Sequence, residues 1–155
     1  MNDFYLEIIS RRKPIEINNI KECNKITKEY GLTLNNNQIV SLLEKRKEIL
    51  EDKGRVEFRS GIIDKIIKEF CNSPYLNKEN YIITLYELID IFYEYKNETN
   101  DLITDEELIK FMKRSFDGVC KGDLEYLSGT IMYKMKRQLL NGESIDNIKE
   151  GEWYE

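Results

Sequence analysis

The stretch Tyr81-Ile-Ile-Thr-Leu-Tyr-Glu-Leu-Ile-Asp-Ile-Phe-Tyr-Glu-Tyr95 decides the fold of this chain. Seven of its apolar residues recur at helical spacings of three and four and form one face: Tyr81, Ile82, Leu85, Leu88, Ile89, Phe92 and Tyr95. Further apolar residues, including Ile83 and Ile91, lie outside that face. Because a helix that is apolar on most sides is usually buried, we expect a central helix with other helices packed around it.

Segments on both sides of this helix repeat the same spacing and are separated by Gly, Pro and Asn. Asn35 with Gln38 and Thr104 with Glu107 have capping-box spacing, and Gly31 stands where a helix-ending glycine is expected. The sequence therefore predicts an all-α, single compact domain of about six helices, at residues 17–30, 36–53, 61–72, 78–96, 105–117 and 123–140.

The ends of the chain differ from this pattern. Residues 3–9 are mostly apolar without a helical face, and Pro14 follows them. We expect residues 1–16 to form an extended arm and residues 143–155 to form an acidic tail. The length of 155 residues fits one domain spanning 1–155.

Composition excludes several chemistries. The chain has no histidine, which is the usual general base and the commonest metal ligand. Its three cysteines are too few for an all-thiolate zinc site, which needs four. We therefore expect no cofactor, no metal ion and no catalytic residue of the common types.

Charge and cysteine usage indicate the compartment and the partners. The net charge of −5 argues against nucleic-acid binding, because phosphate contacts need a basic surface. The cysteines are odd in number and far apart, which is typical of reduced thiols, and no stretch is long and apolar enough for a membrane span. We expect a cytoplasmic protein that does not enter membranes.

The connector at 54–59 is a candidate functional segment because loops carry function more often than core elements do. It contains Arg55, Glu57 and Arg59. A buried Glu57 could act as a general acid or base. The favoured alternative is a surface ion pair.

The turn at 116–124 contains Asp117, Cys120 and Asp123 together with two glycines. Its glycine spacing is one residue short of a phosphate-binding loop, and Asp123 would repel phosphate. A helix N-terminus lowers the pKa of a nearby thiol, so Cys120 could be reactive, but the two aspartates oppose a thiolate. A structural turn is the favoured interpretation.

Gly129 and the tyrosines are candidates for contact with a partner. A glycine inside a helix costs about 1 kcal/mol relative to alanine. Close approach of another backbone is the favoured explanation, and a ligand or partner over the glycine is the alternative. The chain has ten tyrosines, a residue suited to interfaces, and Tyr93 and Tyr95 lie on the central helix. The favoured interpretation places most of the tyrosines half-buried at the edge of the core.

A set of short motifs carries a resemblance to a known family. In chain order they are Tyr30-Gly31-Leu32, Gly54-Arg55-Val56-Glu57-Phe58, Ser73-Pro74-Tyr75, Ile91-Phe92-Tyr93 with Lys96-Asn97-Glu98, Asp105-Glu106-Glu107-Leu108-Ile109, Phe116-Asp117-Gly118 with Cys120 and Gly122, and Leu124-Glu125-Tyr126-Leu127. Over residues 17–140 the chain resembles a bacterial domain-of-unknown-function family of short helical proteins. The resemblance implies a single-domain bacterial protein with no established activity and no catalytic residues to carry over. It also suggests that family-specific features gather in the connectors at 54–59 and 116–124. The candidate binding surface, which we expect to contact a partner, comprises Arg55, Glu57, Arg59, Tyr93, Tyr95, Asn97, Glu98, Asp117, Cys120, Asp123 and Gly129.

Three functions remain open. The first is a helical interaction or regulatory module that binds a protein partner or a second copy of itself in a homodimer. The second is an enzyme or small-ligand protein using Glu57, Asp117 and Asp123, which requires these groups to converge on one pocket. Nucleic-acid binding through Arg11, Arg12 and Lys13 is the third.

Overall fold

The computed structural model describes residues 14–57 and 61–145 of the chain. Within these ranges the ordered structure is helical and contains no strand, which confirms the all-α prediction. A helix at residues 14–22 is followed by α2 (Asn24–Thr27), the 3-10 helix η1 (Lys28–Tyr30), α3 (Asn36–Asp52), α4 (Ile63–Phe70), α5 (Tyr81–Glu98), α6 (Asp105–Asp117), α7 (Leu124–Tyr126), the π-helical turn η2 (Leu127–Ile131) and α8 (Met132–Leu140).

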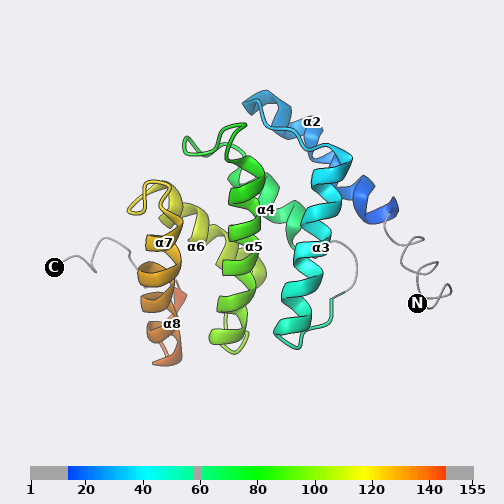
Figure 1. Cartoon of the computed structure of the whole chain (residues 1–155). Coiled ribbons are helices and arrows are strands. Elements are labelled where there is room, and N and C mark those ends of the chain that lie inside the picture. Colours follow the sequence, from blue (N-terminus) through cyan, green and yellow to red (C-terminus); the bar gives the residue numbers. More distant parts are fainter. Residues whose placement is uncertain (1–13, 58–60, 146–155) are drawn as a thin grey trace.

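The predicted central helix, α5, is in the middle of the molecule. It packs against α3, α4, α6 and α8. In Figure 1, α3, α5 and the α7–α8 pair stand side by side, while α4 and α6 pass behind them. Ten of the 18 residues of α5 are buried, so its apolar sides are covered from several directions. This arrangement forms one domain.

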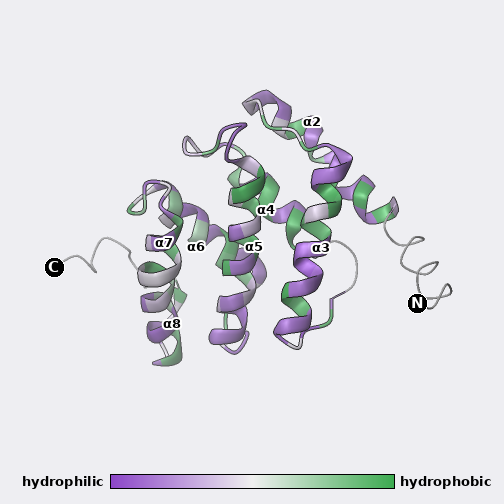
Figure 2. Ribbon diagram, viewed as in Figure 1, coloured by the Kyte–Doolittle hydropathy of each residue, from purple (hydrophilic) through white to green (hydrophobic). Residues whose placement is uncertain are grey.

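The other helices bury one face each. The apolar faces predicted for α3, α4 and α6 are buried as expected, and Phe70 of α4 meets Phe116 of α6 edge to face at 5.6 Å. In Figure 2, α3 and α8 alternate between hydrophilic and hydrophobic residues, as helices with one exposed side do.

Both predicted capping boxes are present. The Asn35 side chain accepts a hydrogen bond from the Gln38 N–H at 2.8 Å, and the Gln38 side chain accepts one from the Asn35 N–H. Thr104 and Glu107 make the same exchange at the start of α6. Gly31 follows η1 with φ of +75°, as predicted for a helix-ending glycine. The residue types at these three helix ends therefore predict the boundaries correctly.

The N-terminal boundaries were predicted wrongly. Residues 14–16, assigned to an extended arm, begin a helix, and the rest of that arm lies outside the described residues. The helix expected at 17–30 is also interrupted after residue 22. The Asn24 side chain both donates to and accepts from the Leu34 backbone at 2.9 Å, which ties the following loop to α2. The interruption turns Ile26 and Tyr30 outward and buries Thr27 instead.

The start of α5 also differs from the prediction. The helix expected at 78–96 begins at Tyr81, so Asn77, the residue just before the expected start, does not cap α5. Asn77 and Asn80 instead exchange side-chain-to-backbone hydrogen bonds of 2.9 Å in the preceding turn. The side chains of this asparagine pair therefore bond within the turn, and neither side chain caps the first turn of α5.

The last predicted helix contains a π turn that accounts for its buried face. Leu127, Ile131, Met135 and Leu139 are all buried although they are four residues apart. In an α-helix, steps of four drift by about 40° each, or about 120° over three steps. The Met132 N–H bonds to the Leu127 carbonyl, five residues back. This wider turn holds one residue more than an α-helical turn, so it reverses about 100° of the drift and keeps the four residues on one face.

Gly129 lies in this π turn, and its favoured explanation was wrong. A Cβ at this position would meet nothing within 4 Å, so no other backbone lies close to it. The glycine is exposed. Close packing therefore does not require a glycine here.

Gly122, by contrast, is required by both conformation and packing. Its φ is +83°, and a Cβ there would lie 2.8 Å from the Tyr75 ring. That ring packs edge to face on Phe116 at 6.1 Å. The turn after α6 therefore packs closely against the turn before α5 at this glycine.

We predict that Gly122→Ala lowers the free energy of unfolding by about 2–4 kcal/mol, because it adds a clash to the strain of a positive φ. Gly142→Ala is the matched control, since Gly142 has a φ of +91° but open space around it. The control should cost only about 1–2 kcal/mol. Urea unfolding midpoints measure the difference, and equal midpoints would contradict the proposed fit.

Candidate functional site

A buried polar cluster lies under the connector that follows α3. The hydroxyl of Tyr93 on α5 donates to Glu57 Oε1 at 2.7 Å. Arg46 of α3 donates from Nε to the same hydroxyl at 3.3 Å, and its Nη2 lies 3.5 Å from Glu57 Oε1. Tyr93 is 0% and Arg46 5% exposed. The connector carboxylate is therefore held by groups that the core provides.

A second group of charges continues this cluster to the end of α5. Arg55 donates to Asn97 Oδ1 at 2.7 Å and to both carboxylate oxygens of Asp101 at 2.9 and 3.3 Å. The buried Lys96 donates to the Ile103 carbonyl at 2.7 Å and lies 2.9 Å from Asp105. We call the side chains of Arg46, Arg55, Glu57, Tyr93, Lys96, Asn97, Asp101 and Asp105 the connector network.

Gly61 leaves room for this network. A Cβ on Gly61 would lie 2.6 Å from Arg46 Nε, and the glycine has a φ of +64°. Since the guanidinium of Arg46 occupies the space of a side chain, the start of α4 can approach α3 only at a glycine.

The pKa shifts in the connector network indicate fixed charge states. Burial, reinforced by the hydrogen bond to Glu57, raises the pKa of Tyr93 above its ordinary range. The hydrogen bond from Arg55 lowers the pKa of Asp101, and the same bond raises the pKa of Arg55. Tyr93 is thus a permanent donor and Asp101 a permanent anion at neutral pH. Such an arrangement fixes the connector, and neither group is suited to exchange protons at that pH.

The sequence-predicted residues of this region separate into groups. Arg55, Glu57, Tyr93 and Asn97 come together in the connector network, while Arg59 lies outside the described residues. Glu98 is exposed and pairs with Lys136 at 3.2 Å.

Tyr93 and Tyr95 were wrongly placed on a binding surface, because both are buried. The hydroxyl of Tyr95 donates to the Ser128 carbonyl in the π turn at 2.5 Å. Burial raises the pKa of Tyr95 to about 12, so it remains a donor at neutral pH. Both rings therefore serve the core of the domain.

The two aspartates in the turn at 116–124 make structural bonds, and its cysteine is buried. Asp117 accepts a hydrogen bond from the Ser73 hydroxyl at 2.6 Å and pairs with Lys113 at 2.6 Å. Asp123 caps α7 by accepting from the Tyr126 N–H at 3.0 Å. Cys120 is buried, so its inclusion in the candidate binding surface was wrong. The favoured interpretation as a structural turn accounts for these contacts.

The two candidate connectors do not share a site. The connector after α3 contacts the C-terminal end of α5 through Tyr93 and Asn97. The turn at 116–124 contacts Tyr75, which precedes the other end of α5. These ends are separated by most of an 18-residue helix, which is about 27 Å long, and Figure 1 shows the two connectors at opposite ends of the molecule.

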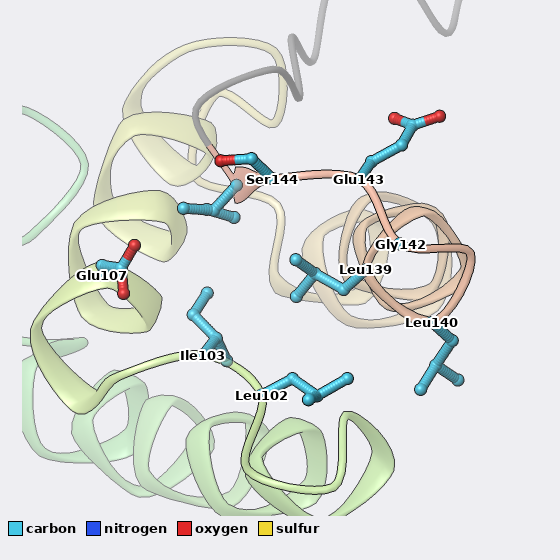
Figure 3. A pocket seen from close by; sticks show the side chains of 9 residues that line it. Leu102, Ile103, Glu107, Leu139, Leu140, Gly142, Glu143 and Ser144 are labelled. Carbon is cyan, nitrogen blue, oxygen red and sulfur yellow. The ribbon is translucent and has the colours of Figure 1, made fainter.

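An open groove lies between the N-terminal end of α6 and the C-terminal end of α8 (Figure 3). Its volume is about 460 Å³, and its lining is mostly apolar: Leu102, Ile103, Glu107, Leu139, Leu140, Gly142, Glu143, Ser144 and Ile145. Leu102 is 62% and Leu140 46% exposed. Figure 3 shows Ile103 and Leu139 pointing into the space, with Leu140 at its edge. We call this feature the α6–α8 groove.

Sequence reasoning did not find the α6–α8 groove. In the last helix Leu139 is buried and its neighbour Leu140 is exposed, but helical periodicity does not show what lies beside Leu140. Leu102 belongs to the loop after α5, where no period applies. Only the folded chain brings these two leucines to one groove.

Comparison with known proteins identifies a family. The model of a family of unknown function, DUF6323, matches residues 19–145. The chain belongs to the DUF6323 family. No curated protein and no solved structure matches this DUF6323 chain.

The described part of the DUF6323 chain contains neither a metal-binding cluster nor a membrane-spanning helix. In the ranges 14–57 and 61–145, no group of three or more cysteine or carboxylate side chains could hold a metal ion. No helix in the described part of the chain is long and apolar enough to cross a membrane.

We predict that Tyr93→Phe lowers the free energy of unfolding by about 1–3 kcal/mol, because it removes the hydroxyl that bonds Glu57 and Arg46 in a buried site. The matched control is Tyr133→Phe on an exposed ring, which should change stability by less than about 0.5 kcal/mol. Urea unfolding compares the two variants. Equal midpoints would show that the connector network does not stabilise the fold.

The Arg55–Asp101 pair predicts an acid-dependent loss of stability. Because the pKa of Asp101 is lower in the folded state, its contribution is present above the ordinary pKa of 3.8. That contribution is lost as the pH falls through the lower, folded value. Asp101 is about half exposed, so the effect should be about 0.2–1 kcal/mol. Unfolding midpoints should differ between the wild type and Asp101→Asn at pH 7 and converge toward pH 2.

The same comparison in an Arg55→Gln background serves as the control. Without its hydrogen-bond donor, Asp101→Asn should have a much smaller effect at pH 7. An undiminished effect would mean that Arg55 does not set the charge state of Asp101.

Proposed function

We propose that this DUF6323 chain is a non-enzymatic, bacterial and cytoplasmic interaction module that binds another protein through the α6–α8 groove. The observation that carries the proposal is the exposure of Leu102 and Leu140 at one groove. Isolated exposed apolar residues are common, whereas apolar residues that share a concave surface are typical of binding sites.

The exposed face of α8 extends this surface. Tyr133 lies two turns before Leu140 on the same side of α8, and both side chains are 46% exposed. Tyrosine suits protein interfaces because its ring is apolar and its hydroxyl is polar. An interface could therefore include the groove and the adjoining helix face.

The compartment and source rest on the sequence. The cysteines in the described ranges, Cys23, Cys71 and Cys120, are free and buried. Burial raises the pKa of the Cys23 and Cys71 thiols, which makes them poorly reactive. Unpaired thiols are usual in a reducing cytoplasm. The resemblance of the motifs described above supports the proposed bacterial source.

An enzyme based on carboxylates has less support. Its candidate groups, Glu57, Asp117 and Asp123, lie on two connectors at opposite ends of α5. Each of these carboxylates also has a bonding partner that explains its position. The geometry therefore favours an interaction surface.

The test is affinity capture followed by mass spectrometry, with three baits in a lysate of cells that make the protein. The baits are the wild type, Leu102→Ser/Leu140→Ser, and the control Ile83→Ser. Ile83 is 60% exposed but lies near the start of α5, away from the groove. We expect a protein that the wild type and Ile83→Ser retain and that the double variant loses at least tenfold. Equal capture by all three baits would overturn the proposed function.

A further inference from the structure

The partner chemistry can be inferred from the charges around the α6–α8 groove, on the basis of the function proposed above. The described lining contains two carboxylates, Glu107 and Glu143, and no lysine or arginine. Figure 3 shows Glu107 on α6 at one side of the apolar floor and Glu143 in the segment after α8 at the other, with the Glu143 side chain directed outward from the rim. A ligand that crosses the floor and continues past this rim would therefore meet a negative charge at both edges.

The other charged side chains near the groove do not neutralise Glu107 and Glu143. Lys136 of α8 is paired with Glu98 at 3.2 Å and lies over the Tyr133 ring at 4.9 Å. Asp105 and Glu106 in the first turn of α6 are paired with Lys96 and Lys65. Arg137 is exposed on α8 but does not line the groove.

The same charges argue against the chain's own acidic C-terminus as the occupant. Residues 146–155 contain four carboxylates and one lysine, so they would bring like charge to Glu107 and Glu143. Electrostatic complementarity instead favours a ligand of the opposite sign. The apolar floor requires that this ligand also carry apolar side chains.

We propose that the α6–α8 groove binds a segment of another protein in which apolar side chains are flanked by lysine or arginine. The apolar side chains occupy the space between Ile103 and Leu139, and the flanking cations lie beside Glu107 and Glu143. The volume of about 460 Å³ holds a few side chains, which fits a short segment and not a whole protein surface.

The test measures fluorescence anisotropy of the full-length chain with labelled synthetic peptides of equal length. The first alternates leucines with lysines, the second replaces each lysine with glutamate, and the third replaces each leucine with serine. We expect the leucine–lysine peptide to bind at least about tenfold more tightly than either of the others. Leu102→Ser/Leu140→Ser should reduce that affinity about tenfold or more.

Matched charge variants separate the groove from the overall acidity of the chain. Glu107→Gln/Glu143→Gln should weaken binding of the leucine–lysine peptide about three- to tenfold. Glutamine at 107 still satisfies the capping box with Thr104, so α6 should remain folded. The control Glu48→Gln/Glu51→Gln makes the same change in net charge on exposed positions of α3 and should have little effect.

Several results would overturn the inference. Equal binding of the leucine–glutamate peptide would exclude charge selection but leave the proposed function standing. Equal binding of the serine–lysine peptide, or equal weakening by the α3 control, would show general attraction to an acidic protein. No binding of any peptide would also overturn the inference, whereas the capture experiment tests the proposed function separately.

Two measurements identify the other possible occupants. A dimer in sedimentation equilibrium that Leu102→Ser/Leu140→Ser abolishes would assign the groove to a second copy of the chain. Trp153 is the only tryptophan, so its emission reports on the C-terminal residues without interference. An emission maximum that shifts to longer wavelength in the same double variant would assign the groove to residues 146–155. Either result would overturn the inference.

Discussion

The structure depends on one constraint: α5 is apolar on most sides and must be covered on most sides. Burial of apolar surface is the main stabilising contribution to folding, so a helix of this kind determines where its neighbours go. In this chain α3, α4, α6 and α8 cover it. The connections between these helices then run around the ends of α5, which is where the polar groups gather.

The C-terminal half of α5 shows what such burial requires. Tyr93 and Lys96 bring a hydroxyl and an ammonium group into the core, and an unpaired polar group there would be costly. Glu57, Arg46, Asp105 and a backbone carbonyl supply their partners. The connector network is therefore explained by the position of α5, and residues that looked like a site in the sequence have a structural role.

Much of the fold follows from local sequence rules, and the errors have physical causes. The helix faces and the two capping boxes were predictable because they depend on residues within one or two turns. The Asn24–Leu34 and Asn77–Asn80 bonds redirected the chain in ways that periodicity does not encode. Tyr93 and Tyr95 were misplaced because tyrosine suits both interfaces and cores, and only packing decides between them.

The candidate site was less predictable than the fold. Glu57 and Tyr93 are 36 positions apart, and Leu102 and Leu140 are brought together by helices that the sequence does not orient. No rule based on spacing relates such pairs. Their proximity results from the packing of complete helices around α5.

The π turn at Leu127–Ile131 has a consequence for how the length of this chain can change. Removing one residue there would restore α-helical winding and rotate all of α8 by about 100° relative to α6. Leu139 would leave the core, and Leu140 would move to a different side of the helix. The extra residue in the π turn therefore sets which way the end of α8 faces. A single deletion in this turn would change the outer surface of the molecule without substituting any residue on that surface.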